Sequence, residues 1–406
     1  MLRVVNHRPQ PYPNNLTTPL IGSCLEIKTP ELNLLCDAGI FFPADREFID
    51  VLATKKVWQA GIDHPVLTAE CYHCLLSHGH TDHYAGLYAL KSDTLVEVYA
   101  GDLTWRVFNE TASLLETISR GKHTRPNVHH VGTFQHGRPL AIDGCRVTPL
   151  IVRHSIPDTW AFVIEHSGTR LLYPPEFMDR FWSSEPDLIR DIDIAVIGYM
   201  PDIEPGDSRF PDKDDALIRG KWEGLVFYVI TGENLESIEN CLQHFYGIRF
   251  VSPYIRDFFT LLPEHMREDF PLIGDAETLD IEHALTAVGL VACNFTELTS
   301  YLDALNNRLD KLYIVSNDFS LSTIASVYVR RKKGRLLPSI LELQKKGQFA
   351  DAFQSAHGSQ RLVRELLAHL LNSRERIIVM VTHATDATSL RDEFGARIEF
   401  RDQYSI

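Results

Sequence analysis

The sequence lacks any uninterrupted apolar run long enough to cross a membrane, since such a span needs about 18 or more consecutive apolar residues. Its opening stretch, MLRVVNHRPQPYPNN, lacks the apolar core of a secretory signal peptide. It also lacks internal repeats and low-complexity tracts. These absences argue against a membrane-spanning, secreted or repeat protein, and we expect a cytoplasmic one.

The sequence also has no surplus of basic residues. It contains 40 Lys and Arg and 54 Asp and Glu, which gives a net charge of −14. This balance argues against a broadly basic surface that coats nucleic acid. It does not exclude a nuclease, since bound divalent cations can themselves neutralise a phosphate. The cysteines lack regular spacing, which indicates reduced thiols. They stand at positions 24, 36, 71, 74, 145, 241 and 293.

The composition is that of a globular protein, with 44% hydrophobic and 10% aromatic residues among 406. This length suggests two or three domains, or one large domain with an insertion. In the first two hundred residues, short apolar strands alternate with Gly, Pro and Asp turns. Polar candidate residues follow several of these strands directly, at the edge where sheet proteins commonly place their chemistry.

The middle of the chain follows a different pattern. Residues 201–215 are rich in Pro, Asp and Gly and predict a boundary. Beyond them, predicted strands such as 224–230 and 312–316 alternate with helical stretches, which favours an α/β unit with a parallel sheet. Near the end, 361–371 predicts a helix and 377–381 a buried strand.

One loop concentrates metal-binding side chains. His78-Gly79-His80-Thr81-Asp82-His83 follows the apolar run that ends at Ser77. Imidazole nitrogen and carboxylate oxygen are suitable ligands for Zn²⁺ or Mn²⁺. In extended backbone His78 and His80 project the same way, while Asp82 and His83 reach a second position. One short loop can therefore begin two neighbouring metal sites, as two-metal hydrolases require. The alternative is a surface loop that happens to be rich in His.

Through this loop and the motifs below, the sequence resembles the metallo-β-lactamase superfamily. Within the superfamily it resembles the ribonuclease J-like branch with a β-CASP insertion. The resemblance covers nearly the whole chain. Asp37, in Leu-Leu-Cys-Asp-Ala-Gly, is similar to the first family motif, and the His-rich loop to the second. His154 resembles the histidine of the third motif, and its sequence His-Ser-Ile-Pro-Asp is particular to ribonuclease J-like proteins. Glu176, in Tyr-Pro-Pro-Glu-Phe, stands where the family has a bridging Asp.

The resemblance extends to the C-terminal part. Ser355-Ala356-His357-Gly358 resembles the Ser-Gly-His motif of the branch, and His383 resembles its final metal-binding His. It implies two divalent metal ions, with zinc favoured over manganese. The first would be held by His78, His80 and His154, the second by Asp82, His83 and His383, with Glu176 between them.

The implied reaction is hydrolysis of a phosphodiester in RNA or single-stranded DNA by a metal-bridging hydroxide. Asp37 would support the metal loop, Asp82 would belong to the catalytic centre, and His357 would contact the phosphate or assist proton transfer. Ser155, Ser355 and His357 would bind substrate. Nucleic acid is the implied partner, and a homodimer is an open possibility.

The implied fold is a four-layer αβ/βα sandwich with an inserted domain. The first part of the sandwich domain would be residues 1–204, the β-CASP-like insertion 205–352, and the C-terminal part 353–406. Two departures keep alternatives open: Glu replaces Asp at 176, and Gly198-Tyr199 stands where the branch has an acidic residue. The alternatives are a hydrolase of a small phosphodiester or ester, and a non-catalytic protein that binds RNA or partners.

Overall fold

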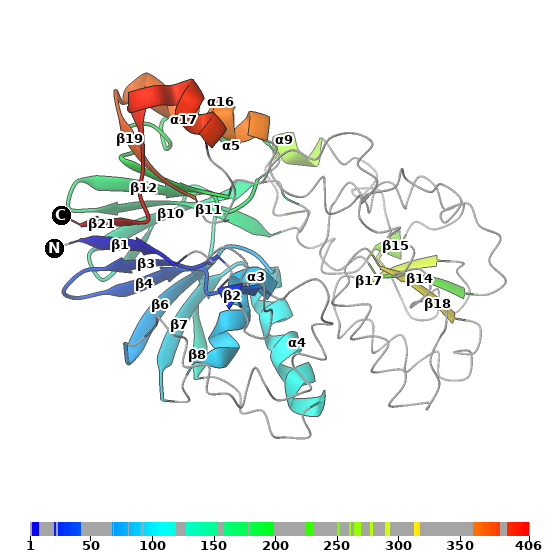
Figure 1. Cartoon of the computed structure of the whole chain (residues 1–406). Coiled ribbons are helices and arrows are strands. Elements are labelled where there is room, and N and C mark those ends of the chain that lie inside the picture. The colour runs from blue at the N-terminus through cyan, green and yellow to red at the C-terminus, as the bar shows by residue number, and fades with distance from the viewer. Residues whose placement is uncertain are drawn as a thin grey trace.

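The computed structural model (Figure 1) describes most of the two ends of the chain and short pieces of its middle. Some side chains within these ranges, including that of Asp82, lie outside the description. The described residues are 2–7, 20–21, 23–41, 67, 69–79, 81–90, 93–118, 127–152, 154, 158–177, 179–198, 225–229, 250–251, 260, 264–268, 277–278, 289–292, 312–316, 360–381 and 388–405.

Within these residues, two seven-stranded mixed sheets face one another. The first has the strand order β21 (Gln403–Ser405), β1 (Arg3–Asn6), β3 (Leu25–Lys28), β4 (Asn33–Cys36), β6 (Cys71–Leu76), β7 (Leu95–Ala100) and β8 (Val128–Thr133). The second has the order β20 (Ile398–Phe400), β19 (Ile377–Val381), β13 (Ile194–Ile197), β12 (Thr169–Tyr173), β11 (Thr159–His166), β10 (Cys145–Val152) and β9 (Leu140–Ile142).

Each sheet changes from antiparallel to parallel pairing along its width. In the first sheet β4, β6, β7 and β8 run parallel, and in the second β12, β13, β19 and β20 do. Parallel neighbours send their carboxyl ends to one edge, so the residues that follow them gather there. Asp37 follows β4, His78 follows β6 and Glu176 follows β12.

Helices cover the outer face of each sheet, which makes four layers (Figure 1). On the first sheet lie α3 (Thr81–Tyr84), the 3-10 helix η1 (Ala85–Ala89) and α4 (Asp102–Ile118). On the second lie α5 (Phe181–Ser184), α16 (Gln360–Ser373) and α17 (Thr388–Phe394), followed by the 3-10 helix η3 (Gly395–Arg397). None of the described helices combines the length and the apolar character that a membrane crossing needs.

The strand sequences explain the layers, because neighbouring residues in a strand face opposite sides of the sheet. In β13 every residue is buried: Ile194 and Val196 pack between the sheets, whereas Ala195 and Ile197 pack under the helices. A strand covered on both faces reads as a continuous apolar run, as this one does. The α/β sandwich predicted from the sequence is therefore confirmed.

The two ends of the chain meet in the first sheet, where β21 pairs with β1 (Figure 1). Next to this pair, Asn6 Nδ2 donates a hydrogen bond of 2.8 Å to the carbonyl oxygen of Val381, at the end of β19 in the other sheet. The N-terminal strand is thus hydrogen-bonded to the end of β19 in the other sheet.

The short described pieces add further strands and one helical turn. The predicted strands at 224–230 and 312–316 are confirmed, and they pair in parallel as neighbours in a separate three-stranded sheet. This sheet has the order β17 (Gly289–Ala292), β14 (Leu225–Val229) and β18 (Leu312–Ser316). Two-stranded pairs join β15 (Phe250–Val251) to β16 (Glu277–Thr278) and β2 (Leu20–Ile21) to β5 (Ile40–Phe41), and α9 spans Glu264–Arg267. The domain boundaries at 204/205 and 352/353 lie outside the described residues.

The sequence suggested reduced thiols, and each cysteine of the described part is free. These are Cys24, Cys36, Cys71, Cys74 and Cys145.

Stability of the sandwich should depend on the packing between the sheets. Phe162 of β11 is fully buried there, with ring centroids 5.0 Å from Phe134 and 6.4 Å from Tyr173. We expect Phe162→Ala to lower the free energy of unfolding by about 3–5 kcal/mol, because it removes apolar contacts and leaves a cavity. Val131→Ala, at a side chain 46% exposed, should change it by about 0.5 kcal/mol or less. Denaturant unfolding would measure both, and equal losses would contradict the assigned core.

Candidate metal centre

Four side chains from both sheets come together at the carboxyl ends of the strands. His78 follows β6 and His83 lies in α3, so both belong to the first sheet and its helix layer. His154 follows β10 and Glu176 follows β12, so both belong to the second sheet. All four are buried. Residues separated by almost a hundred positions in sequence therefore lie together, as the resemblance implied.

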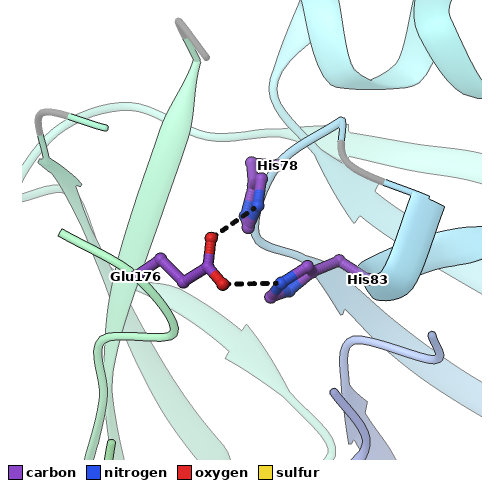
Figure 2. A group of neighbouring side chains, drawn as sticks. All are labelled: His78, His83 and Glu176. Carbon is purple, nitrogen blue, oxygen red and sulfur yellow. Dashed lines mark ion pairs between the residues drawn. The ribbon is translucent and has the colours of Figure 1, made fainter. Parts of the chain in front are cut away.

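The Glu176 carboxylate points towards His78 and His83 (Figure 2). Its Oε2 is 2.6 Å from His154 Nε2 and 3.6 Å from His78 Nε2. Its Oε1 is 3.7 Å from His83 Nε2. The His78 ring centroid lies 3.9 Å from that of His83 and 4.9 Å from that of His154. One carboxylate oxygen thus faces two imidazoles and the other faces the third.

Asp37 lies beneath the imidazoles, and its carboxylate receives four hydrogen bonds. Oδ1 accepts one of 2.7 Å from the Ser77 backbone N–H. Oδ2 accepts three of 2.7 Å, from Ser77 Oγ–H, His83 Nδ1–H and Tyr173 O–H. The carboxylate is fully buried, so this set of donors replaces the water it would otherwise bind. The backbone φ of Asp37 is +60°, a region that Asp enters more readily than most residues.

These hydrogen bonds determine which ring nitrogen carries the lone pair in the neutral forms of His78 and His83. A carboxylate only accepts, so His83 must donate to Asp37 from Nδ1. Ser77 gives its only hydroxyl hydrogen to Asp37, so its 2.9 Å contact with His78 Nδ1 needs the hydrogen on that nitrogen. The neutral form of each ring then has its lone pair on Nε2, the atom that faces Glu176.

Tyr173 is a site residue that the sequence analysis missed. It ends β12 in the second sheet, yet its hydroxyl bonds to Asp37 of the first sheet, 136 positions away. Burial, followed by the neighbouring Asp37 charge, raises the pKa of Tyr173 well above its ordinary value. The phenol therefore stays protonated and remains a donor. The only sequence signal for it was its place two residues before Pro175-Glu176.

The donor set fits a divalent metal ion. Ligand atoms of His78, His83 and Glu176 all lie within 4.8 Å of one another. Imidazole nitrogen with carboxylate oxygen is a usual ligand combination for Zn²⁺. The contacts of Asp37 with His83 Nδ1 and of Ser77 with His78 Nδ1 are of the kind that orient metal-binding histidines. With His154 beside Glu176, the group offers three imidazoles and one carboxylate.

Several predicted site residues lie outside the described part of the chain: His80, Ser155, Ser355, His357 and His383. Asp82 is placed by its backbone in α3, between Thr81 and His83, while its side chain is not described. Gly198, which stands where an acidic residue was expected, is half-buried directly after β13. The structure therefore brings together Asp37, His78, His83, His154 and Glu176 of the predicted set.

Removing the Asp37 carboxylate should cost more than removing one of its donors. Asp37→Ala leaves four buried donors without their acceptor, and we expect a loss of about 3–5 kcal/mol in the free energy of unfolding of the metal-free protein. Tyr173→Phe removes one hydrogen bond to a charged group and should cost about 1.5–3 kcal/mol. Denaturant unfolding in the presence of a chelator would measure both. Equal losses in the two variants would mean that Asp37 does not organise the network.

Comparison with known proteins agrees with this architecture. A sequence profile described as "Beta-lactamase superfamily domain" matches residues 46–214. A crystal structure of a protein of unknown function from Enterococcus faecalis V583 is 15% identical, with a TM-score of 0.53 and 100% of each chain covered. No curated protein matches this chain.

Two further solved structures match parts of the chain. Zinc-bound PqqB from Methylobacterium extorquens is 18% identical, with a TM-score of 0.33, over 49% of this chain and 72% of that one. The short form of human tRNase Z is 15% identical, with a TM-score of 0.32, over 49% of this chain and 79% of that one. The profile match over residues 46–214 is to a beta-lactamase superfamily domain, and the two facing mixed sheets are consistent with a metallo-β-lactamase sandwich.

Proposed function

We propose that this protein is a metal-dependent phosphodiester hydrolase that cuts RNA or single-stranded DNA, in the manner of ribonuclease J-like proteins. The observation that carries the proposal is the buried group of three imidazoles around the Glu176 carboxylate. Such a set of nitrogen and oxygen donors is suited to hydrolytic metal ions. The His-Ser-Ile-Pro-Asp motif beginning at His154 supports the ribonuclease J-like assignment.

The proposed ligand sets divide the site into two positions. His78, His80 and His154 would hold one ion, and Asp82, His83 and His383 the other. The orientation of Glu176 supports this division, because Oε2 faces His78 and His154 while Oε1 faces His83. In the proposal Glu176 would be shared by the two ligand sets. Zinc is the preferred ion for this donor set, and manganese is the second choice.

The bound ions would supply activation of a water molecule and stabilisation of the charge that develops on the phosphate. The chain itself would orient the ligands, and Asp37 does so through His83 and Ser77. His154 Nε2 lies 2.6 Å from Glu176 Oε2, and both residues would be ligands in the proposal. In the proposal His357 contacts the phosphate or transfers a proton, and Ser155 and Ser355 bind the substrate.

Nucleic acid can approach this acidic chain if the charge is neutralised locally. The net charge is −14, so attraction cannot come from the molecule as a whole. Two divalent ions at the site would provide four positive charges where the phosphate binds. The proposed β-CASP-like insertion, residues 205–352, would cover the substrate, and the parallel arrangement of β17, β14 and β18 supports an α/β unit there. A homodimer remains part of the proposal.

A second candidate function is hydrolysis of a small phosphodiester or ester, and a third is metal-dependent or metal-free binding without catalysis. Both alternatives are supported by Glu176, which contacts His154 at 2.6 Å and carries one methylene more than the Asp of the family. The half-buried Gly198 offers no acid where the branch has one.

Metal analysis would test the ligand assignment. We expect wild-type protein to bind two equivalents of Zn²⁺, and His78→Ala and His383→Ala each to bind less, because each removes one imidazole nitrogen. Val131→Ala, on the exposed part of β8, is the control and should match wild type. Elemental analysis after dialysis would measure the stoichiometry. Full occupancy in both histidine variants would contradict the assignment.

Cleavage assays would separate the three functions. Labelled single-stranded RNA should be cut by the metal-loaded protein and spared by His80→Ala, which removes a proposed ligand. A small activated phosphodiester, bis(p-nitrophenyl) phosphate, serves as the comparison substrate. Cleavage of the small substrate without cleavage of RNA or single-stranded DNA would favour the second function. Metal binding without any hydrolysis would favour the third.

A further inference from the structure

Asp158 directly precedes β11, the strand that pairs with β10, and His154 follows the end of β10. Asp158 is 2% exposed and has a backbone φ of +63°. Its Oδ2 accepts a 2.8 Å hydrogen bond from the Thr104 backbone N–H, and its Oδ1 accepts one of 2.7 Å from Trp160 Nε1–H. Its carbonyl oxygen accepts another, of 3.1 Å, from Thr104 Oγ1–H. Asp158 is therefore held by hydrogen bonds to both its side chain and its backbone.

Thr104 belongs to the other half of the sandwich. It lies in the first turn of α4, the helix that follows β7 of the first sheet. The first backbone N–H groups of a helix have no partner within the helix, and the helix dipole is positive there, so a carboxylate is stabilised. Gly101 leaves the room for it: a Cβ at this position would lie 1.8 Å from Asp158 Oδ1 and 2.2 Å from Oδ2.

A second link forms two residues after Asp158. The backbone N–H of Trp160 donates a 2.9 Å hydrogen bond to the carbonyl oxygen of Ser77. Ser77 directly precedes His78, and its side chain bonds to Asp37 and His78. The segment from Asp158 to Trp160 is thus bound to the first sheet at two points, one of them adjacent to a proposed ligand.

We propose that Asp158 is a positioning residue, which fixes the paired ends of β10 and β11, next to His154, against the first sheet and its helix layer, which carry His78 and His83. The inference rests on the proposed function, in which all three histidines bind metal. Metal–ligand distances vary by only about 0.2 Å in a working site. A histidine from the second sheet therefore needs a rigid connection to the first. The contacts of Asp158 and Trp160 provide one at the start of β11, where Thr159 pairs with Val152, two residues before His154.

The charge of Asp158 is nevertheless unfavourable for stability, because the effect of burial outweighs that of the start of α4 and of the hydrogen bonds. Burial raises the pKa of the Asp158 carboxyl to about 7, although the hydrogen bonds from Thr104 and Trp160 oppose this effect; the nearby Asp102 raises it further. Because the pKa in the folded protein lies above the ordinary value, ionisation of this group at neutral and higher pH weakens folding. Asp158→Asn removes this cost. Its NH₂ end cannot accept, so one of the two N–H contacts is lost.

Binding of Co²⁺, whose visible absorption depends on its ligands, tests the role without relying on activity. We expect Asp158→Asn to fold, to bind Co²⁺ about 10–100-fold more weakly than wild type, and to show an altered Co²⁺ absorption spectrum because His154 is displaced. A purely structural role would leave the spectrum unchanged.

Glu26→Gln is the matched control. Glu26 of β3 is also a buried carboxylate with hydrogen-bonded partners, His7 at 2.9 Å and Lys28 at 2.9 Å. Its neutralisation should change the thermal unfolding midpoint and leave the affinity for Co²⁺ and the spectrum as in wild type. If Glu26→Gln alters both as Asp158→Asn does, the effect comes from general destabilisation and the inference fails.

The outcomes separate the inference from the proposed function. Wild type that binds Co²⁺, together with Asp158→Asn of unchanged affinity and spectrum, overturns the positioning role alone. Wild type that binds no Co²⁺ overturns the metal site and with it the inference. Should Asp158→Asn not fold, Trp160→Phe keeps an aromatic ring in the core and removes the donor to Oδ1 together with part of the buried indole. It should shift affinity and spectrum in the same direction by a smaller amount, and no shift would again overturn the inference.

Discussion

The structure of the site depends on one buried carboxylate, that of Asp37. Four hydrogen bonds reach it, three from Ser77 and His83 of the first sheet and its helices and one from Tyr173 of the second. An ionised carboxylate in the interior is tolerated only with such a set of donors. Since the donors include an imidazole that faces Glu176, the charge that must be satisfied in the core also orients the group where chemistry is proposed.

The second constraint is that the site draws its side chains from two sheets. Packing of apolar side chains between sheets resists separation, but it is not directional. Directional contacts between the halves accompany it: Tyr173 with Asp37, Trp160 with Ser77, and Asn6 with the carbonyl of Val381. They are concentrated at the edge where the parallel strands end. The same edge therefore carries both the hydrogen bonds between the sheets and the proposed ligands.

Glu176 shows how one substitution is accommodated by its surroundings. The side chain is longer than the Asp expected by resemblance, and it follows Pro174 and Pro175. Its carboxylate reaches the middle of the three imidazoles, close to His154 and farther from His78 and His83. The added methylene thus does not carry the carboxylate out of the site. It brings one oxygen into hydrogen-bond distance of a histidine from the same sheet.

The strands of the sandwich and the approximate positions of Asp37, His78, His83, His154 and Glu176 could be predicted from the sequence. Both depend on local signals: continuous apolar runs that mark strands buried on two faces, and polar residues directly after their ends. Most of the ligand set was named through motifs that each lie within a few residues.

The connections between those motifs could not be predicted in this way. Tyr173 reaches Asp37 across 136 positions, and Asp158 reaches Thr104 across 54. Neither contact leaves a periodic or local pattern, because it depends on how two sheets pack and on where a helix begins. The sequence by itself determined which side chains stand at the ends of the strands. Only the tertiary structure decided which of them meet, since hydrogen bonds form according to distance in space.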